Sequence, residues 1–156
     1  MLTAHLPSGY ILGRTPPVAG LMPVAILGAV LPDFDILFFY FIDDRAFNHH
    51  YYWVHLPIFW VCVAAIVLPL LAWKGYLKAG LVFFAAILMH LLLDTISGGI
   101  AWGLPFDDKL FSLVTVPATQ SHWILSFMVH WTFLFEIVIW AVAGVLFWRQ
   151  MRGRRA

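Results

Sequence analysis

Long apolar stretches separated by short polar segments constrain this chain more than any other feature. They cover residues 18–42, 57–73, 77–96 and 124–148, and each is close to the roughly 20 residues that an α-helix needs to cross a bilayer. Hydrophobic residues make up 63% of the chain and charged residues 11%, which excludes an ordinary soluble domain. We therefore predict an all-α, polytopic membrane bundle of about four spans, forming a single integral-membrane domain over residues 1–156.

Two segments depart from this simple pattern. The sequence "LPDFD", residues 31–35, interrupts the first stretch because Pro32 breaks a helix. Residues 3–13 predict a short interfacial or re-entrant helix that ends near "RTPP", residues 14–17. The loop 97–122 follows a glycine terminator, "SGG", at the end of the third span.

The basic residues indicate the orientation of the bundle. In a four-span topology, all nine Lys and Arg residues except Arg45 and Lys109 fall on one side of the membrane. Cytoplasmic loops carry the excess of basic residues. We therefore expect both termini to be cytoplasmic and the loops 43–56 and 97–123 to face outward.

The third span carries a histidine and an aspartate, His90 and Asp94, within "MHLLLDT". Ionisable groups are costly inside a membrane, so they usually mark a functional site. Four residues correspond to about 400° of helical rotation, which places both side chains on one face, one turn apart. This geometry suits two ligands of one metal or a histidine held by its carboxylate. A buried polar pair that joins two helices is the alternative.

Asp33 and Asp35 follow Pro32 with no basic residue beside them. Two neighbouring carboxylates need a cation or a shared proton to offset their repulsion. In extended backbone both side chains would point the same way, whereas in a helix they would not. An aspartate that caps a helix beginning at Ile36 is the alternative, and it would account for one carboxylate only.

Three histidines lie within "NHHYYWVHLP", residues 48–57, just before the second span. An aromatic interfacial loop with incidental histidines would be an alternative reading. Six ionisable residues lie toward the outward ends of their spans: Asp33, Asp35, His50, His55, His90 and Asp94. This convergence predicts a metal site of nitrogen and oxygen ligands, with zinc expected and manganese or iron as alternatives.

The remaining ionisable residues carry weaker signals. His122 precedes the last span on the outward side. His130 and Glu136 are six residues apart and do not share a helix face. We interpret Glu136 as a structural residue that pairs with another helix.

The ordered motifs resemble those of the YdjM-like family of small bacterial inner-membrane proteins, which are described as membrane-bound metal-dependent hydrolases. The resemblance covers roughly residues 1–106: an early His5, "LPDFD", His50 and His55 ahead of a helix, "HLLLDT" and "WGLPF". More distantly, the histidine–aspartate helix is similar to those of zinc-dependent phospholipase C and the single-strand-specific zinc nucleases. The family's "HRGxTHS" is here "HYYWVHL", which keeps both histidines but loses the arginine.

The resemblance implies a set of site residues and a function. Metal ligands would be His5, Asp33, His50 or His55, His90 and Asp94, with one to three zinc ions. Asp35 would be a further ligand or a base, and Asp33 or Asp35 would act on the attacking water. A re-entrant hairpin turning at "RTPP" would bring His5 to the outward side. Arg45 would take the place of the missing arginine, and we expect His49 and His122 to contact the substrate beside it.

These features predict a metal-dependent phosphoester hydrolase, resembling a phospholipase or phosphatase, at the outer face of the bacterial inner membrane. The substrate would be a membrane lipid or lipid-linked molecule, and we expect no nucleic-acid partner. A homodimer is compatible with the sequence. A metal or proton transporter, or a non-catalytic metal-binding protein, is the alternative function.

Overall fold

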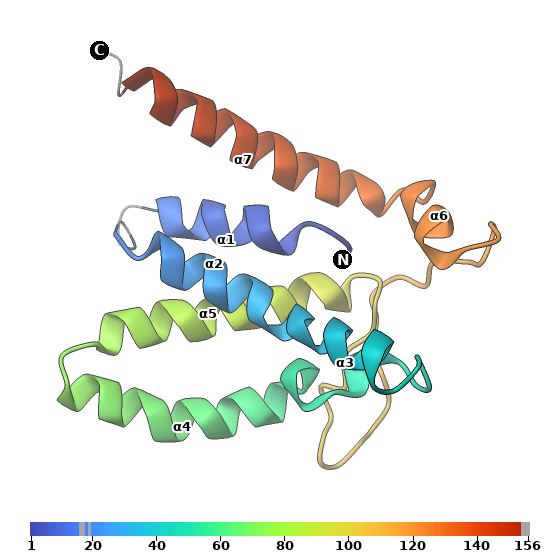
Figure 1. The fold of residues 1–156 in the computed structure, drawn as a ribbon, viewed down its shortest axis with the longest axis horizontal. Helices are drawn as coiled ribbons and strands as arrows, with labels where there is room; N and C mark the ends of the chain where they lie inside the picture. Colours follow the sequence, from blue (N-terminus) through green and yellow to red (C-terminus); the bar gives the residue numbers. More distant parts are fainter. Residues whose placement is uncertain (16–17, 19, 154–156) are drawn as a thin grey trace.

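The computed structural model describes residues 1–15, 18 and 20–153. Within this part the chain is helical, as the sequence predicted. The elements in chain order are α1 His5–Arg14, α2 Met22–Val30, η2 Leu31–Phe34, α3 Asp35–Phe41, η3 His49–Tyr51, η4 Trp53–His55, α4 Pro57–Trp73, α5 Leu77–Thr95, α6 Trp123–Met128 and α7 Phe133–Gly153. Most of the helices run back and forth along one direction (Figure 1).

Helices α1 and α2 form a tight hairpin that packs on α5, and α4 packs on the other side of α5 (Figure 1). Small residues allow this close approach. A Cβ atom on Gly28 would lie 2.5 Å from the carbonyl oxygen of Phe83 on α5. Ala25 and Ala29 on α2 are fully buried. The backbone of α2 therefore lies close enough to α5 for its carbonyl groups to contact the side chains of α5.

The predicted interruption of the first span is confirmed, and its form is now defined. Pro32 lies in the 3₁₀ turn η2, and α3 begins directly afterwards at Asp35. The backbone at Asp33 and Asp35 is therefore helical rather than extended. The N-terminal helix expected over residues 3–13 is present as α1, and its "RTPP" turn includes Pro16 and Pro17, which lie outside the described residues.

The last apolar stretch differs from its predicted form. Residues 124–148 were expected to form one span, but the helix is divided into α6 and α7 by residues 129–132. Here the Nδ1 atom of His130 lies 2.9 Å from the hydroxyl of Thr132 and accepts from the Thr132 amide at 3.4 Å. Such local side-chain bonds compete with helical hydrogen bonds. Helix α7 then begins at Phe133.

The apolar helices have the lengths of membrane spans. Residues 22–41, α5 and α7 are each long and apolar enough to cross a bilayer, and α4 is a shorter apolar helix. Large apolar side chains remain exposed along these helices, as expected for surfaces that face lipid; examples are Leu81, Ile66, Val138 and Trp140. These features agree with the predicted membrane bundle.

The structure separates the two ends of the bundle by charge. Arg14 ends α1, Lys74 follows α4, Lys78 lies in the first turn of α5, and Arg149 and Arg152 lie near the end of α7, all at the same end (Figure 1). Arg154 and Arg155, which the sequence assigned to this side, lie outside the described residues. The N-terminus lies at the opposite end from the end of α7 (Figure 1). The expectation that both termini lie on one side therefore does not fit this fold.

Candidate metal centre

Histidine and aspartate side chains from distant parts of the chain meet at the end of the bundle that lies away from the basic residues. We call this group the His/Asp cluster. Its members come from α1, η2, α3, the segment before α4, and α5; they are His5, Asp33, Asp35, His49, His50, His55, His90 and Asp94. The convergence predicted from the sequence is therefore present in the structure.

His90 is held by the backbone of α2. Its Nδ1 atom lies 2.7 Å from the carbonyl oxygen of Ala29, and because a carbonyl can only accept, Nδ1 carries a proton. In a neutral ring the Nε2 atom then presents a lone pair. That atom lies 3.0 Å from Oδ2 of Asp94, one turn further along α5. At this distance the pair is satisfied either by a proton on Nε2 or by a bound cation.

His50 is oriented in the same way by the loop after α5. Its Nδ1 atom donates to the carbonyl of Gly98 at 2.9 Å, and its Nε2 atom lies 3.9 Å from Oδ2 of Asp94. Burial is the main cause that lowers the pKa of His50, to about 3, although Asp94 acts in the opposite direction. His50 is therefore a neutral ring at pH 7, the form that binds metals.

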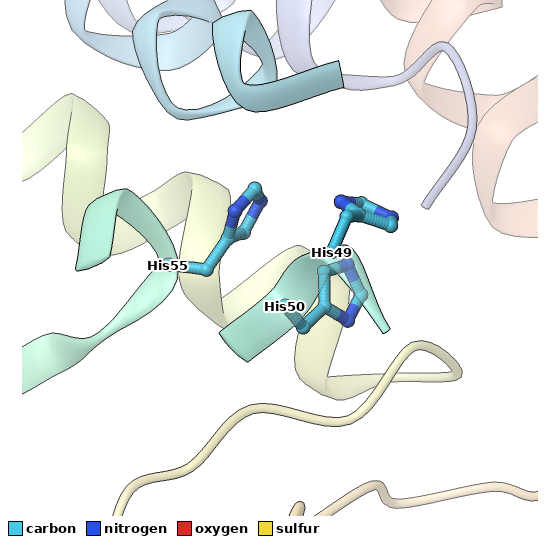
Figure 2. A group of neighbouring side chains, drawn as sticks. All are labelled: His49, His50 and His55. Atoms are coloured by element: carbon cyan, nitrogen blue, oxygen red, sulfur yellow. The ribbon is translucent and has the colours of Figure 1, made fainter. Parts of the chain in front are cut away.

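His55 lies between two carboxylates. Its Nδ1 atom lies 2.8 Å from Oδ2 of Asp35, and its Nε2 atom lies 3.6 Å from Oδ2 of Asp94. Burial on its own would lower the pKa of His55, but the two carboxylates outweigh it and raise this pKa to about 9. Figure 2 shows the rings of His49, His50 and His55 grouped at the segment that precedes α4. Without a metal, the positive charge that the carboxylates require is a proton on His55.

The distances between these atoms match those between ligands of a single ion. Zinc holds nitrogen and oxygen ligands at about 2.0–2.2 Å in a tetrahedron, so two ligand atoms lie about 3.3–3.6 Å apart. The Nε2 atoms of His90 and His55 are 3.3 Å apart, and each faces Oδ2 of Asp94. Oδ1 of Asp33 lies 3.7 Å from the Nε2 atom of His90. These atoms form a nitrogen and oxygen set that zinc would accept.

His5 contacts the other carboxylate oxygen of Asp94. Its Nε2 atom lies 3.1 Å from Oδ1 of Asp94, and its ring stacks on that of His90 with centroids 3.7 Å apart. The ammonium group of Met1 also contacts Oδ1 of Asp94. The re-entrant hairpin of α1 and α2 brings His5 to this end, as the sequence reasoning required. His5, His90 and Asp94 thus form one group whose possible ligand atoms all lie within 4.8 Å of one another.

Asp35 does not cap a helix. Its element begins without a side-chain capping bond, and its carboxylate lies against His55 and, at 3.4 Å, the Nδ1 atom of His49. The capping alternative therefore fails for Asp35. Asp33 and Asp35 reach different histidines because a helical backbone points them in different directions.

Several buried polar atoms of the cluster make no hydrogen bond of regular geometry within the described residues, although some of them lie close to one another. They are both ring nitrogens of His5, both carboxylate oxygens of Asp35, Nδ1 of His49, Nδ1 of His55 and Oδ2 of Asp94. Buried polar groups normally find partners, and each exception needs an explanation such as a bound ion. The donor set and its unpartnered atoms therefore fit a metal ion.

The three residues expected to contact a substrate lie in different places. His49 belongs to the cluster, and its side chain is 27% exposed. Arg45 is exposed, and its guanidinium lies 5.8 Å from the ring centroid of Tyr40. His122 is exposed and caps α6 by accepting from the amide of Ile124. The contacts described for Arg45 and His122 are thus with residues outside the cluster.

The sequence reasoning missed the backbone partners of the cluster. The carbonyl groups of Ala29 and Gly98 fix the rings of His90 and His50, and no side-chain pattern reports a carbonyl. The sequence also predicted that Glu136 pairs with another helix. In the structure Glu136 binds the segment before α1. The spacing of Glu136 within its own helix carries no signal for that contact.

Comparison with known proteins identifies the family. The model of the YdjM inner membrane protein family matches residues 2–155, so the chain belongs to that family. Comparison with curated proteins and with solved structures gives no match.

Proposed function

We propose that this member of the YdjM inner membrane protein family is a metal-dependent phosphoester hydrolase that acts on a lipid-borne substrate at the outer face of the inner membrane. One observation carries the proposal. The Nε2 atoms of His50, His55 and His90 all face Oδ2 of Asp94, at 3.9, 3.6 and 3.0 Å. Three imidazoles around a buried carboxylate suit a cation, which would take the place of the proton on His55, and zinc is the ion we expect.

The cluster residues have distinct parts in this proposal. His55, His90, Asp94 and Asp33 would hold one ion, and His5 would add a ligand on the far side of Asp94. A bound zinc ion would act as a Lewis acid, making water more acidic and offsetting charge on phosphoryl oxygens. Asp33 or Asp35 would orient the attacking water and accept its proton. The scarcity of Lys and Arg at this end fits a phosphoryl group that is held by metal.

A substrate would reach the cluster by way of Asp33 and His49. The side chains of these two residues are each 27% exposed, whereas those of His55 and His90 are fully buried. Asp33 lies next to Phe34, which is 54% exposed, and α3 then presents further exposed apolar side chains, including Leu37 and Phe41. An opening bordered by an apolar helix suits a substrate whose phosphoester is carried by a lipid chain.

A transporter would need polar groups along its path. At the basic end of the bundle, a hollow between α2, α4 and α5 is lined by apolar side chains such as Val24, Val67 and Phe83. This hollow therefore offers no polar continuation from the cluster towards that end. This favours a site at one face of the membrane, which is what hydrolysis requires.

The test combines metal analysis with an assay of phosphate release. Protein purified in detergent without chelator should contain zinc, and it should release phosphate or a phosphorylated head group from phospholipid in mixed micelles. Chelation should abolish the activity and zinc should restore it. A wild-type protein that neither contains nor binds a transition metal would overturn the proposal. Tight zinc binding without turnover on any phospholipid would instead support a non-catalytic metal-binding role.

A further inference from the structure

Glu136 is a buried carboxylate that the proposed chemistry does not use. It lies in the first turn of α7 and is 1% exposed. Its Oε1 atom accepts from the amide of Leu2, and its Oε2 atom accepts from the amide of Thr3 at 2.9 Å and from the Thr3 hydroxyl at 2.6 Å. A carboxylate that binds several donors of one short segment fixes the position of that segment.

A second side chain of α7 completes this contact. The indole Nε1 of Trp140, one turn after Glu136, donates to the hydroxyl of Thr3 at 3.0 Å. The hydroxyl of Thr3 thus bridges Glu136 and Trp140. Among the described residues of α7, the buried ones are Glu136 and Ala143, so this helix has little apolar packing against the bundle. Its polar contact with residues 2–3 is therefore a principal attachment.

The segment held by Glu136 leads directly into His5. Unlike His50 and His90, His5 has no backbone carbonyl bound to its ring, and its ring contact is that of Nε2 with Oδ1 of Asp94 at 3.1 Å. Nothing comparable to the carbonyls of Ala29 or Gly98 orients its ring. The ring is positioned by stacking on His90 and by its backbone, whose carbonyl accepts from the hydroxyl of Ser8 at 2.7 Å. The backbone position of residues 2–5 must therefore be set by other contacts.

We propose that Glu136 is a positioning residue of the metal centre: by binding the backbone of Leu2 and Thr3, it places His5 against Asp94. The inference rests on the proposed metal-binding function, which it extends to a helix that contributes no ligand. Removing the carboxylate leaves the amides of Leu2 and Thr3 without their acceptor in a partly buried place, which is unfavourable. The segment would then move to reach other partners, and His5 would move with it.

The first measurement reports the position of His5 without any metal. Diethyl pyrocarbonate acylates accessible imidazole nitrogens, and mass spectrometry resolves the rate at each histidine. In chelator-treated wild-type protein, buried His5 and His90 should react slowly and exposed His122 quickly. In Glu136→Ala, the rate at His5 should rise towards that of His122, while His90 stays protected. Protection of His90 shows that the bundle remains folded.

The matched control changes the neighbouring residue of the same helix turn. Ile137 is 50% exposed, and Ile137→Ala removes side-chain volume from α7 while keeping the carboxylate of Glu136. It should label as wild type does. If Glu136→Ala also exposes His90, Glu136→Gln decides the matter, because the amide keeps one acceptor oxygen. In that variant His5 should react at an intermediate rate while His90 remains protected.

The second measurement connects the contact to metal. Zinc binding by Glu136→Ala should weaken by about 10–100-fold relative to wild type, the usual effect of losing a group that positions a ligand. Ile137→Ala should bind zinc as wild type does. A merely structural change in α7 would not alter zinc affinity while His90 stays protected.

Each outcome separates this inference from the proposed function. If His5 stays protected in both Glu136 variants, the positioning role is overturned. Zinc binding by the wild-type protein would still support the proposed metal centre. Exposed His5 with unchanged zinc affinity would also overturn it. If wild type binds no zinc, the proposed function fails and Glu136 is no positioning residue of a metal centre, whatever the labelling shows of residues 2–5.

Discussion

The Nε2 atom of His90 lies 3.0 Å from Oδ2 of Asp94, across one turn of α5. The other ring nitrogen of His90 is bound to the carbonyl of Ala29 on α2. In a neutral ring the remaining nitrogen presents a lone pair to the carboxylate. An ion between them would convert this repulsion into coordination, and three of our predictions test that interpretation.

Replacing His90 should abolish high-affinity metal binding. His90→Ala removes the nitrogen that lies at the centre of the ligand set, so zinc affinity should fall by more than the 10–100-fold typical of a residue outside the ligand shell. Metal content by mass spectrometry and competition with a chromogenic chelator measure the effect. His122→Ala, which changes an exposed histidine at the start of α6, should keep its zinc. Equal zinc content in the two variants would mean that His90 is not a ligand.

Asparagine variants distinguish the two carboxylates of "LPDFD". Asp33→Asn should lower both zinc occupancy and activity, because an amide is a poorer ligand and carries no charge to balance the cation. Asp35→Asn should still bind zinc when the ion is supplied in excess. Its turnover should nevertheless remain about 10²–10⁴-fold below wild type, the usual loss when a general base is removed.

The measurements for this pair are zinc occupancy and phosphate release at saturating zinc. An unchanged circular dichroism spectrum would show that both variants are folded. Full activity in both would assign "LPDFD" to shaping the backbone alone. The metal ligands would then have to come from the histidines and Asp94.

The sequence predicted those parts of the site that depend on local geometry. His90 and Asp94 share a face because the helical period requires it, and Pro32 marks the break before α3. His90 and Asp94 indicated a functional site because they lie in an apolar stretch that was expected to cross the membrane. An ionisable group has few structural reasons to be there. The candidate metal ligands named from the sequence are the residues that the structure brings together.

Contacts between distant segments could not be predicted in the same way. Glu136 binds backbone amides of Leu2 and Thr3, and an amide is present at every residue except proline, so the sequence gives no partner. The division between α6 and α7 was missed because residues 129–132, "VHWT", contain neither glycine nor proline. The side of the membrane assigned to the N-terminus was inferred from charges alone, whereas the hairpin of α1 and α2 decides its place in the bundle.

A methyl group at Gly98 should disturb the site without unfolding the bundle. A Cβ atom there would lie 3.2 Å from Nδ1 of His50 and 3.1 Å from the carbonyl oxygen of Asp94. His50 would have to move, and it would lose its bond to the Gly98 carbonyl. We expect Gly98→Ala to weaken zinc binding by about 10–100-fold. Gly144→Ala, where no atom lies within 4 Å of the new Cβ, should match wild type. Equal zinc affinity in the Gly98 and Gly144 variants would contradict the inclusion of His50 among the imidazoles that face Asp94 around the ion.

The orientation of the bundle can be tested by labelling single cysteines from outside the cell. Cys62 is exposed on α4, so it is first replaced by alanine. Cysteines at Ala46 and Lys109 lie in loops at the end that carries the His/Asp cluster, and a cysteine at Tyr76 lies between α4 and α5 at the basic end. Because basic residues favour the cytoplasmic side, positions 46 and 109 should react with a membrane-impermeant maleimide in intact spheroplasts. Position 76 should react only after permeabilisation. The reverse pattern would place the cluster in the cytoplasm, and a substrate in the outer leaflet would then be out of its reach.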